Sequence, residues 1–177
     1  MRPWFAPINT PPAPAARRQP GVIGGQDKAE ALGRSQGGFS TKLHLRAEGG
    51  GKPITVVLTG GERNEQIAPE ALLDQGAIRR HGRGRPRLRP RKVAGDKGYS
   101  SPTARRRLRQ RGIRPVIPTR SDQPRQPDFD RNAYRQRNRV ERLINRLEQA
   151  RRVATRYERR AANYLAMVHI GCILLWL

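Results

Sequence analysis

The sequence contains a single cysteine, Cys172, among its 177 residues. One thiol cannot form an internal disulfide, and it excludes a zinc site of the usual type built from several cysteines. Aromatic residues make up only 5% of the chain and hydrophobic residues 35%, so we expect one domain with a modest core. Long apolar runs are also missing. The C-terminal stretch IGCILLWL (170–177) is far shorter than the roughly 20 residues that a membrane-spanning helix needs, so we predict a buried helix end there.

Acidic residues are scarce as well. The chain has 14 Asp and Glu against 37 Lys and Arg, a formal net charge of +23. A compact state with this charge repels itself unless a polyanion screens it, and nucleic acid is the natural candidate. A membrane surface fits less well, because the cations extend along the whole chain instead of forming one face of an amphipathic helix. The N-terminus has no continuous apolar stretch of the kind found in signal peptides, so we expect a cytoplasmic protein.

The N-terminal segment 1–38 is rich in Pro, Gly, Ala and Arg and shows no apolar periodicity, so we predict that it is disordered. Residues 39–177 carry the patterns of a folded domain. Two β-type runs, TKLHLRAE and PITVVLTG, surround the turn GGGK and predict a β-hairpin. In the first run Lys42, His44 and Arg46 alternate with leucines, which predicts one solvent-exposed face.

The remaining patterns alternate between helical and strand types, which indicates an α/β protein with helices covering a sheet. Ser101 is a plausible N-cap and Gly112 a plausible stop for the helix between the last two strands, and this order favours a parallel pair with a crossover. The expected elements are a weak helix in 64–78, a cationic loop at 79–92, strands near 92–95 and 113–118, a helix in 101–112, a long helical pattern over 131–157 and a final helix over 161–176.

Asp96 follows directly after the short strand KVAG, at the carboxyl end of a strand, where open α/β sheets present their site residues. The alternative is that Asp96 pairs with Lys97 or begins a turn through its own side chain. On the long helix, Tyr134, Arg137 and Glu141 fall on a narrow polar stripe beside the packing face. The alternative for Glu141 is a surface acid in helical ion pairs.

Taken together, the two acids predict a metal site. A carboxylate at a strand end and one on a helix that packs against the same sheet are oxygen ligands suited to Mg²⁺, with phosphate oxygens completing the shell. Two such ions stabilise the attacking and leaving oxygens of a displacement at phosphorus. The histidines His44, His81 and His169 are not spaced as a metal cluster, and we assign them no chemistry.

The order and spacing of several phrases resemble the DDE transposases of bacterial insertion sequences, from about residue 27 onward. The phrases are LGRSQGGFSTKLHL (32–45), VLTGGERNE (57–65), VAGDKGYSS (93–101), RGIRPVIP (111–118), the stretch 129–158 beginning FDRNAYRQRNRVERL, and NYLAMVHIGCILLWL (163–177). The resemblance implies an RNase H-like fold, a mixed sheet flanked by helices. It also implies Mg²⁺ as cofactor, DNA as partner and a bacterial, cytoplasmic protein, and leaves homo-oligomers possible in intact relatives.

By this resemblance Asp96 and Glu141 correspond to the second and third acids of the catalytic and metal-binding triad. The family signature on the long helix matches Tyr134, Arg137 and Glu141, but Glu148 stands where the family has a lysine that contacts DNA. The DNA-binding residues implied are Tyr134, Arg137, Lys97, Arg83, Arg85 and Arg87.

The first triad aspartate belongs on the first strand of the sheet, but residues 1–26 contain no Asp or Glu. We therefore expect this strand to be missing or degenerate, and the chain to be an N-terminally truncated fragment. Asp27 is a weak candidate for the missing ligand.

The resulting hypothesis is a role in DNA transposition. The chain would be a catalytic-domain fragment whose intact relatives perform Mg²⁺-dependent DNA cleavage and strand transfer, while the fragment itself is inactive. The alternative is a non-catalytic basic protein that binds DNA or RNA. Metal separates the two, because a simple nucleic-acid coat binds equally well in Mg²⁺ and EDTA and does not depend on Asp96 or Glu141.

Overall fold

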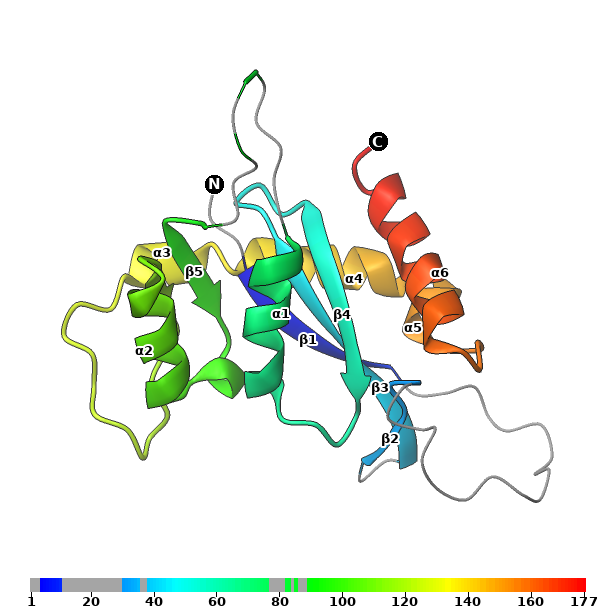
Figure 1. Cartoon of the computed structure of the whole chain (residues 1–177), viewed down its shortest axis with the longest axis horizontal. Helices are drawn as coiled ribbons and strands as arrows, with labels where there is room; N and C mark the ends of the chain where they lie inside the picture. The colour runs from blue at the N-terminus through cyan, green and yellow to red at the C-terminus, as the bar shows by residue number, and fades with distance from the viewer. Residues whose placement is uncertain (1–3, 11–29, 36–37, 77–81, 84, 86–88) are drawn as a thin grey trace.

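A computed structural model shows a mixed sheet with helices on both faces (Figure 1). It describes the whole chain except residues 1–3, 11–29, 36–37, 77–81, 84 and 86–88. The strands are β1 (Trp4–Thr10), β2 (Gly33–Ser35), β3 (Gly38–Ala47), β4 (Pro53–Gly60), β5 (Lys92–Gly95) and β6 (Arg114–Val116). The helices are α1 (Ala68–Gln75), α2 (Pro102–Gln110), α3 (Arg131–Arg135), α4 (Asn138–Glu148), α5 (Arg151–Ala154) and α6 (Ala161–Leu174), with 3-10 turns η1 (Glu65–Ile67) and η2 (Lys97–Tyr99).

The strands are arranged in the order β4-β3-β1-β5-β6, with β2 pairing along the first residues of β3. The hairpin strand β3 is antiparallel to both β4 and β1, whereas β1, β5 and β6 are parallel to one another. The predicted hairpin and the predicted parallel pair on either side of α2 are both confirmed.

The first strand is present, so of the two expected alternatives, missing or degenerate, the first is wrong; β1 lacks the expected aspartate. β1 lies at the centre of the sheet, where Trp4 is in register with Ala47 of β3 and with Ala94 of β5. The segment WFAPINT contains residues with high β-propensity, and two neighbouring strands offer it a complete ladder. Pro7 is tolerated because the pairing with β5 ends at Phe5, two residues before the proline.

The structure also differs from the prediction of a disordered segment at residues 1–38. It places β1 and β2 in that segment and joins both to the main sheet. Composition misled the prediction because the Pro- and Ala-rich residues that dominate it follow β1 in the chain. Residues 11–29, including Asp27, lie outside the described part.

Alternation along the strands divides the core into two layers. Leu43 and Leu45 of β3 and Ala94 of β5 pack with α4, α5 and α6 on one face. Val93 of β5 and Tyr99 of η2 pack with α1 and α2 on the other face. Figure 1 shows α1 and α2 on the near side of the sheet and α4 crossing behind it.

The hairpin face that we predicted to be exposed is buried beneath α1. His44 is 0% exposed, and Arg46 is 1% exposed. The His44 ring nitrogens lie 3.2 Å from Tyr99 Oη and 2.9 Å from Thr59 Oγ1, and Arg46 donates to carbonyl oxygens of α1. The alternation of polar and apolar residues along β3 was predicted correctly. The polarity of the residues, however, did not show that a helix covers this face.

The helical pattern over 131–157 is divided into α3, α4 and α5 instead of forming one helix. The turn between α3 and α4 is tightened by three-residue hydrogen bonds, such as that from Arg137 N to Tyr134 O at 2.9 Å. Ala150 is extended (φ −75°, ψ 103°) and redirects the chain into α5. There the Val153 carbonyl accepts a bond from Tyr164 Oη of α6 at 2.8 Å. Tertiary packing therefore overrides a continuous helical pattern.

Local signals at α2 and α6 were read correctly. Ser101 Oγ accepts a bond from Ala104 N at 2.9 Å and caps α2, and Gly112 follows its end with φ +70°. The final helix α6 begins at Ala161 as expected, but the prediction of a buried helix end is wrong, because Ile173 is 60% exposed and Leu174 is 62% exposed. In the described part of the chain, every helix is too short or too polar to cross a lipid bilayer.

Candidate functional site

Asp96 stands at the carboxyl end of β5, on the face of the sheet that α4 covers. Ala94 packs with α4 on that face, and a Cβ at Gly95 would contact Tyr99 and Ile117 on the opposite face. Asp96 is extended (φ −75°, ψ 168°), so its side chain returns to the face of Ala94. It is half-buried and makes no capping hydrogen bond to η2. The turn is therefore not held by the Asp96 carboxylate.

Glu141 lies in the first turn of α4, a helix that packs on β1. Its side chain is 48% exposed and forms an ion pair with Arg137, one helical turn earlier. This contact is the one that the ion-pair interpretation of Glu141 predicted. Such exposed pairs contribute only a few tenths of a kcal/mol, so they leave the carboxylate accessible to a stronger cation.

Tyr134 of α3 connects the two acids. The Arg137 guanidinium lies 5.5 Å from the centre of its ring, and the ring of Phe129 packs beside it at 5.4 Å. Burial raises the pKa of the Tyr134 phenol, Arg137 opposes this shift, and the negative charges of Asp96 and Glu141 add to it. The printed contacts thus join Tyr134, Arg137 and Glu141 to one another, and the charge of Asp96 acts on the same phenol.

A supporting contact escaped the sequence analysis. Asp130 Oδ1 accepts a bond from Ala133 N at 2.8 Å and caps α3, and Lys92 Nζ of β5 pairs with Asp130 Oδ2 at 2.8 Å. This link fixes the helix that carries Tyr134 to the strand that ends at Asp96. An aspartate directly before a helical pattern, such as Asp130 before α3, is an N-cap signal, so this contact could have been predicted from the sequence.

The strand register shows which residue of β1 stands level with Asp96. Phe5 is paired with Gly95, so Ala6 stands level with Asp96 on the neighbouring strand. β1 contains no acid, and the described ranges hold no group of three His, Cys, Asp or Glu side chains that could bind a metal. Glu30 is used elsewhere, because its carboxylate accepts a bond from Ala161 N at 2.6 Å at the start of α6.

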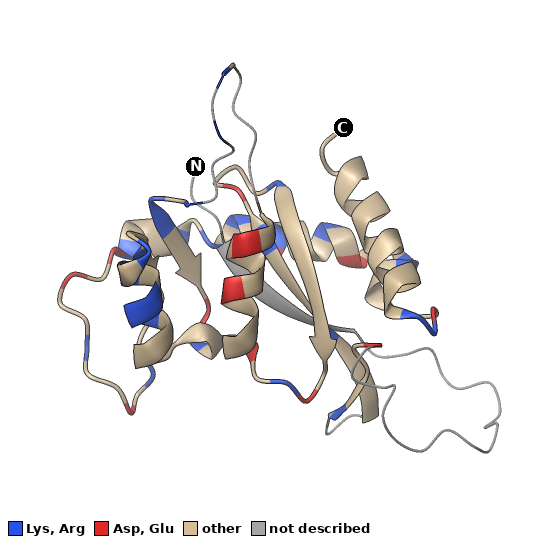
Figure 2. Ribbon diagram, in the orientation of Figure 1, with Lys and Arg blue, Asp and Glu red and all other residues tan. Residues whose placement is uncertain are grey.

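The other predicted DNA-binding residues lie on the surface. Lys97, Arg83 and Arg85 are exposed, whereas Arg87 lies outside the described residues. Glu148, which stands at a lysine position of the resemblance, is also exposed, at the end of α4. Figure 2 shows basic residues along α2 and α4 and acidic residues on α1.

Asp96 and Glu141 are the two carboxylates at this edge that could hold a divalent ion. Mg²⁺ is commonly bound through one or two carboxylates together with substrate phosphates and water, and Asp96 and Glu141 supply that number of side chains. A second ion would require a further carboxylate near Asp96. Ala6 cannot provide one.

Comparison with known proteins identifies the family of this chain. The family described as the transposase DDE domain matches residues 8–177. A Burkholderia cepacia protein named for the transposase of insertion sequence element IS402 is 36% identical over 135 residues, 76% of this chain and 62% of that protein. A Brucella ovis protein named for the transposase of element IS6501 is 27% identical over 143 residues, 78% of this chain and 99% of that protein. The chain thus spans under two thirds of the first relative and nearly all of the second, and it belongs to the transposase DDE domain family.

Proposed function

We propose that the chain serves DNA transposition as a transposase catalytic domain that binds DNA but carries an incomplete catalytic site. The strand order β4-β3-β1-β5-β6, with an antiparallel hairpin beside three parallel strands, supports an RNase H-like fold. The observation that carries the proposal is the family match, and it is supported by the position of Asp96 directly after β5 and of Glu141 on α4, the helix that packs on β1.

In this proposal Asp96 and Glu141 hold one Mg²⁺, and Tyr134 and Arg137 bind the DNA beside it. A bound divalent ion supplies positive charge to the phosphate that it contacts. Arg137 is released from Glu141 when that carboxylate binds the ion, and it is then free to contact a phosphate oxygen. The exposed Lys97, Arg83 and Arg85, together with Arg87, are proposed to contact the DNA backbone.

Cleavage is not expected from this chain alone. Displacement at phosphorus by the two-metal mechanism needs both the attacking and the leaving oxygen to be stabilised, and the donor set fits one ion. The first test is a labelled duplex incubated with the purified protein in Mg²⁺ or Mn²⁺, beside Asp96→Ala and Glu141→Ala. No nicking is expected. Nicking that disappears in both variants would show that the site is complete, and Asp27 would then be the first residue to test.

Ala6→Asp should restore part of the metal site. Because Ala6 is level with Asp96 in the strand register, an aspartate there adds a third carboxylate oxygen ligand. We expect the affinity for Mn²⁺, measured by isothermal titration calorimetry, to increase by about tenfold or more, with Ala6→Asn as the uncharged control.

The increase should disappear when Asp96→Ala is added to Ala6→Asp. Equal affinities for the aspartate and asparagine variants would contradict the proposed site. The alternative function, a non-catalytic coat for DNA or RNA, predicts that neither EDTA nor the loss of Asp96 and Glu141 changes nucleic-acid binding.

A further inference from the structure

Helix α4 has a second polar edge, separate from the edge that carries Glu141. Arg139, Arg142 and Arg146 are spaced three and four residues apart, so they form one stripe along the helix. At about 100° per residue, the centre of this stripe lies roughly 130° from Glu141 around the helix axis, so the two polar edges border opposite sides of the exposed face of α4. The buried residues Val140, Leu143 and Leu147 form the face between the two edges that packs on the sheet.

This stripe faces the glycine-rich turn between β3 and β4. A hollow of about 360 Å³ is lined by Gly50 and Gly51 of the turn and by Arg139, Arg142, Leu143 and Arg146 of α4. One wall is therefore the glycine turn, and the other is the side of α4 that carries three arginines and Leu143; backbone and arginine groups together are suited to binding phosphate oxygens.

Close contact between the turn and the helix forms the hollow. The Arg139 guanidinium donates to Gly49 O at 2.6 Å and holds the turn against α4. Gly51 has φ +93°, and a Cβ there would lie 3.3 Å from both Cβ and O of Arg139. A side chain at position 51 would therefore be strained and would push the turn away from the helix.

Two arginines of the hollow form no ion pair among the described residues, and the one acid beside the turn is the Glu48 carboxylate next to Gly50. Arg142 and Arg146 are exposed, and no carboxylate among the described residues forms an ion pair with either. The nearest acid of the turn, Glu48, is buried and accepts a bond from Lys52 N at 3.1 Å. An anion is therefore the ligand that this surface favours.

The length of the stripe favours a polyanion over a single small anion. From Arg139 to Arg146 the helix rises about 10 Å. One strand of duplex DNA presents a phosphate about every 3.4 Å along the axis, so a strand running beside α4 offers about three phosphates to three arginines. With a chain charge of +23, nucleic acid fits this surface better than a free phosphate ion.

We propose that this hollow, the α4–turn groove, binds the phosphodiester backbone of a nucleic acid. The proposal deepens the proposed function, since it assumes the same DNA partner and adds a contact site that sequence reasoning did not identify. Arg142 directly follows Glu141 in α4, so a duplex held in the groove lies across the helix that carries the candidate ligand.

The first test compares DNA binding by two double variants. One variant loses two charges in the groove, and the other loses two charges elsewhere on the surface. Arg142→Gln with Arg146→Gln is matched by Arg106→Gln with Arg109→Gln on α2, which covers the opposite face of the sheet. Both pairs are exposed and lower the net charge by the same amount, and arginine and glutamine have similar helix propensities.

Binding of a short labelled duplex is measured by fluorescence anisotropy in EDTA between about 50 and 200 mM NaCl. Each lost phosphate contact reduces the slope of log K against log salt by about 0.9, so the groove pair should reduce it by about 1.8. The α2 pair should reduce it by less than half that amount. Equal losses from the two pairs would overturn the groove. Because EDTA removes the metal, this result is independent of the proposed catalytic site.

A second measurement uses the unaltered protein, so it does not depend on a variant folding. Butanedione modifies accessible arginines, and mass spectrometry reports the extent at each position with and without duplex. Bound duplex should protect Arg142 and Arg146 at least threefold more than Arg106 and Arg109. Uniform protection would overturn the groove, as would protection by anionic phosphatidylserine vesicles but not by DNA.

Discussion

Buried basic residues with neutral partners are the main feature at the residue scale. Arg156 is 2% exposed and donates to the carbonyls of Glu30 at 2.8 Å and Arg159 at 2.9 Å. Arg105 is 7% exposed and donates to Pro118 O at 3.0 Å. Burial lowers the pKa of both guanidiniums. With so few acids available, this chain compensates its buried cations with backbone dipoles, and Arg156 in this way joins segments far apart in the sequence.

The burial of His44 should make stability depend on pH. Burial lowers its pKa from the usual 6.5 to about 4, with a smaller contribution from Lys42. Above pH 6.5 the ring is neutral in both states, and the full stability is present. As pH falls from 6.5 toward 4, the unfolded chain binds a proton that the folded chain does not, so the free energy of unfolding falls by up to about 3 kcal/mol.

Urea unfolding at pH 5 and pH 7 measures this effect. His44→Gln should have a lower stability at both pH values but a smaller difference between them, because carboxyl groups alone then contribute. The exposed His169→Gln is the control and should retain the difference seen in the unaltered protein. An unchanged pH difference in His44→Gln would contradict the assigned burial effect.

The same residue shows where sequence reasoning stops. Alternation of Leu43 and Leu45 with polar residues identified the strand and its two faces correctly. It could not show that the polar face is buried, because His44 finds Thr59 on the next strand and Tyr99 more than 50 positions away. Long-range partners decide whether a polar strand face is wet or buried, and no local pattern records them.

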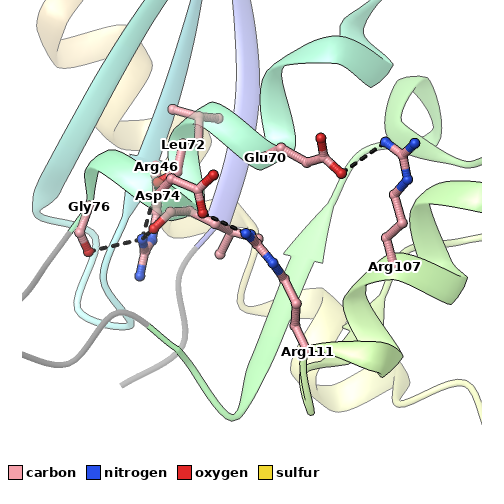
Figure 3. A network of polar contacts seen from close by, with 8 residues as sticks. Arg46, Glu70, Leu72, Asp74, Gly76, Arg107 and Arg111 are labelled. Atoms are coloured by element: carbon pink, nitrogen blue, oxygen red, sulfur yellow. Dashed lines mark hydrogen bonds and ion pairs between the residues drawn. The ribbon is translucent and has the colours of Figure 1, made fainter.

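At the element scale, helix α1 is held by two kinds of polar contact (Figure 3). On its inner side Arg46 donates to the carbonyls of Leu72 at 3.1 Å and Gly76 at 3.0 Å, near the end of the helix. On its outer side Glu70 pairs with Arg107 of α2 at 2.8 Å, and a second pair joins Asp74 to Arg111, which directly follows α2. The inner contacts are buried, and the outer pairs are largely exposed.

We expect the inner contact to dominate the stability of α1. Arg46→Met leaves buried carbonyls without a donor and should lower the free energy of unfolding by about 2 to 4 kcal/mol. A double-mutant cycle on Glu70→Ala and Arg107→Ala should give a coupling below about 1 kcal/mol, since the pair is exposed. Urea unfolding measures both.

The matched control for Arg46→Met is Arg106→Met, on an exposed position of α2, which should change stability by less than about 0.5 kcal/mol. A loss at Arg46 no larger than the ion-pair coupling would contradict this ranking.

Elements marked by local chemistry were the predictable part of the fold. The cap at Ser101 and the positive φ at Gly112 depend on neighbours within a few residues, and both were read from the sequence. β1 was missed because its order depends on β3 and β5, which flank it in space but not in sequence. Asp96 and Glu141 could be proposed as a pair from local sequence patterns. The proposal of Ala6 as a third ligand position required the strand register, which the sequence does not show.

At the scale of the whole molecule, electrostatic repulsion and ion pairing oppose each other. Six ion pairs are formed among the described residues, and most involve at least one exposed or half-exposed side chain. Each contributes about 0 to 1 kcal/mol. Against them stands the mutual repulsion of a net charge of +23. Salt screens both the attraction within ion pairs and the repulsion between like charges. Whichever of the two has the larger total energy decides whether added salt lowers or raises the stability of the fold.

We expect repulsion to win, so NaCl should stabilise the fold while it weakens DNA binding. Raising NaCl from about 50 to 200 mM should increase the thermal unfolding midpoint, because screening shortens the range over which like charges repel. The same change should weaken duplex binding by about 10³ to 10⁵ if the protein makes 6 to 10 phosphate contacts.

A short duplex should combine the two effects of salt on the unfolding midpoint. At low salt the duplex binds only the folded chain and raises the unfolding midpoint by mass action, so protein with duplex is then more stable than protein alone. At high salt the duplex dissociates, and the two midpoints should converge on the value that screening alone produces. Differential scanning fluorimetry with and without duplex measures all four conditions. If the unfolding midpoint of the free protein fell with added NaCl, the ion pairs would outweigh the repulsion. The excess positive charge would then not destabilise the free fold, and the prediction would be wrong.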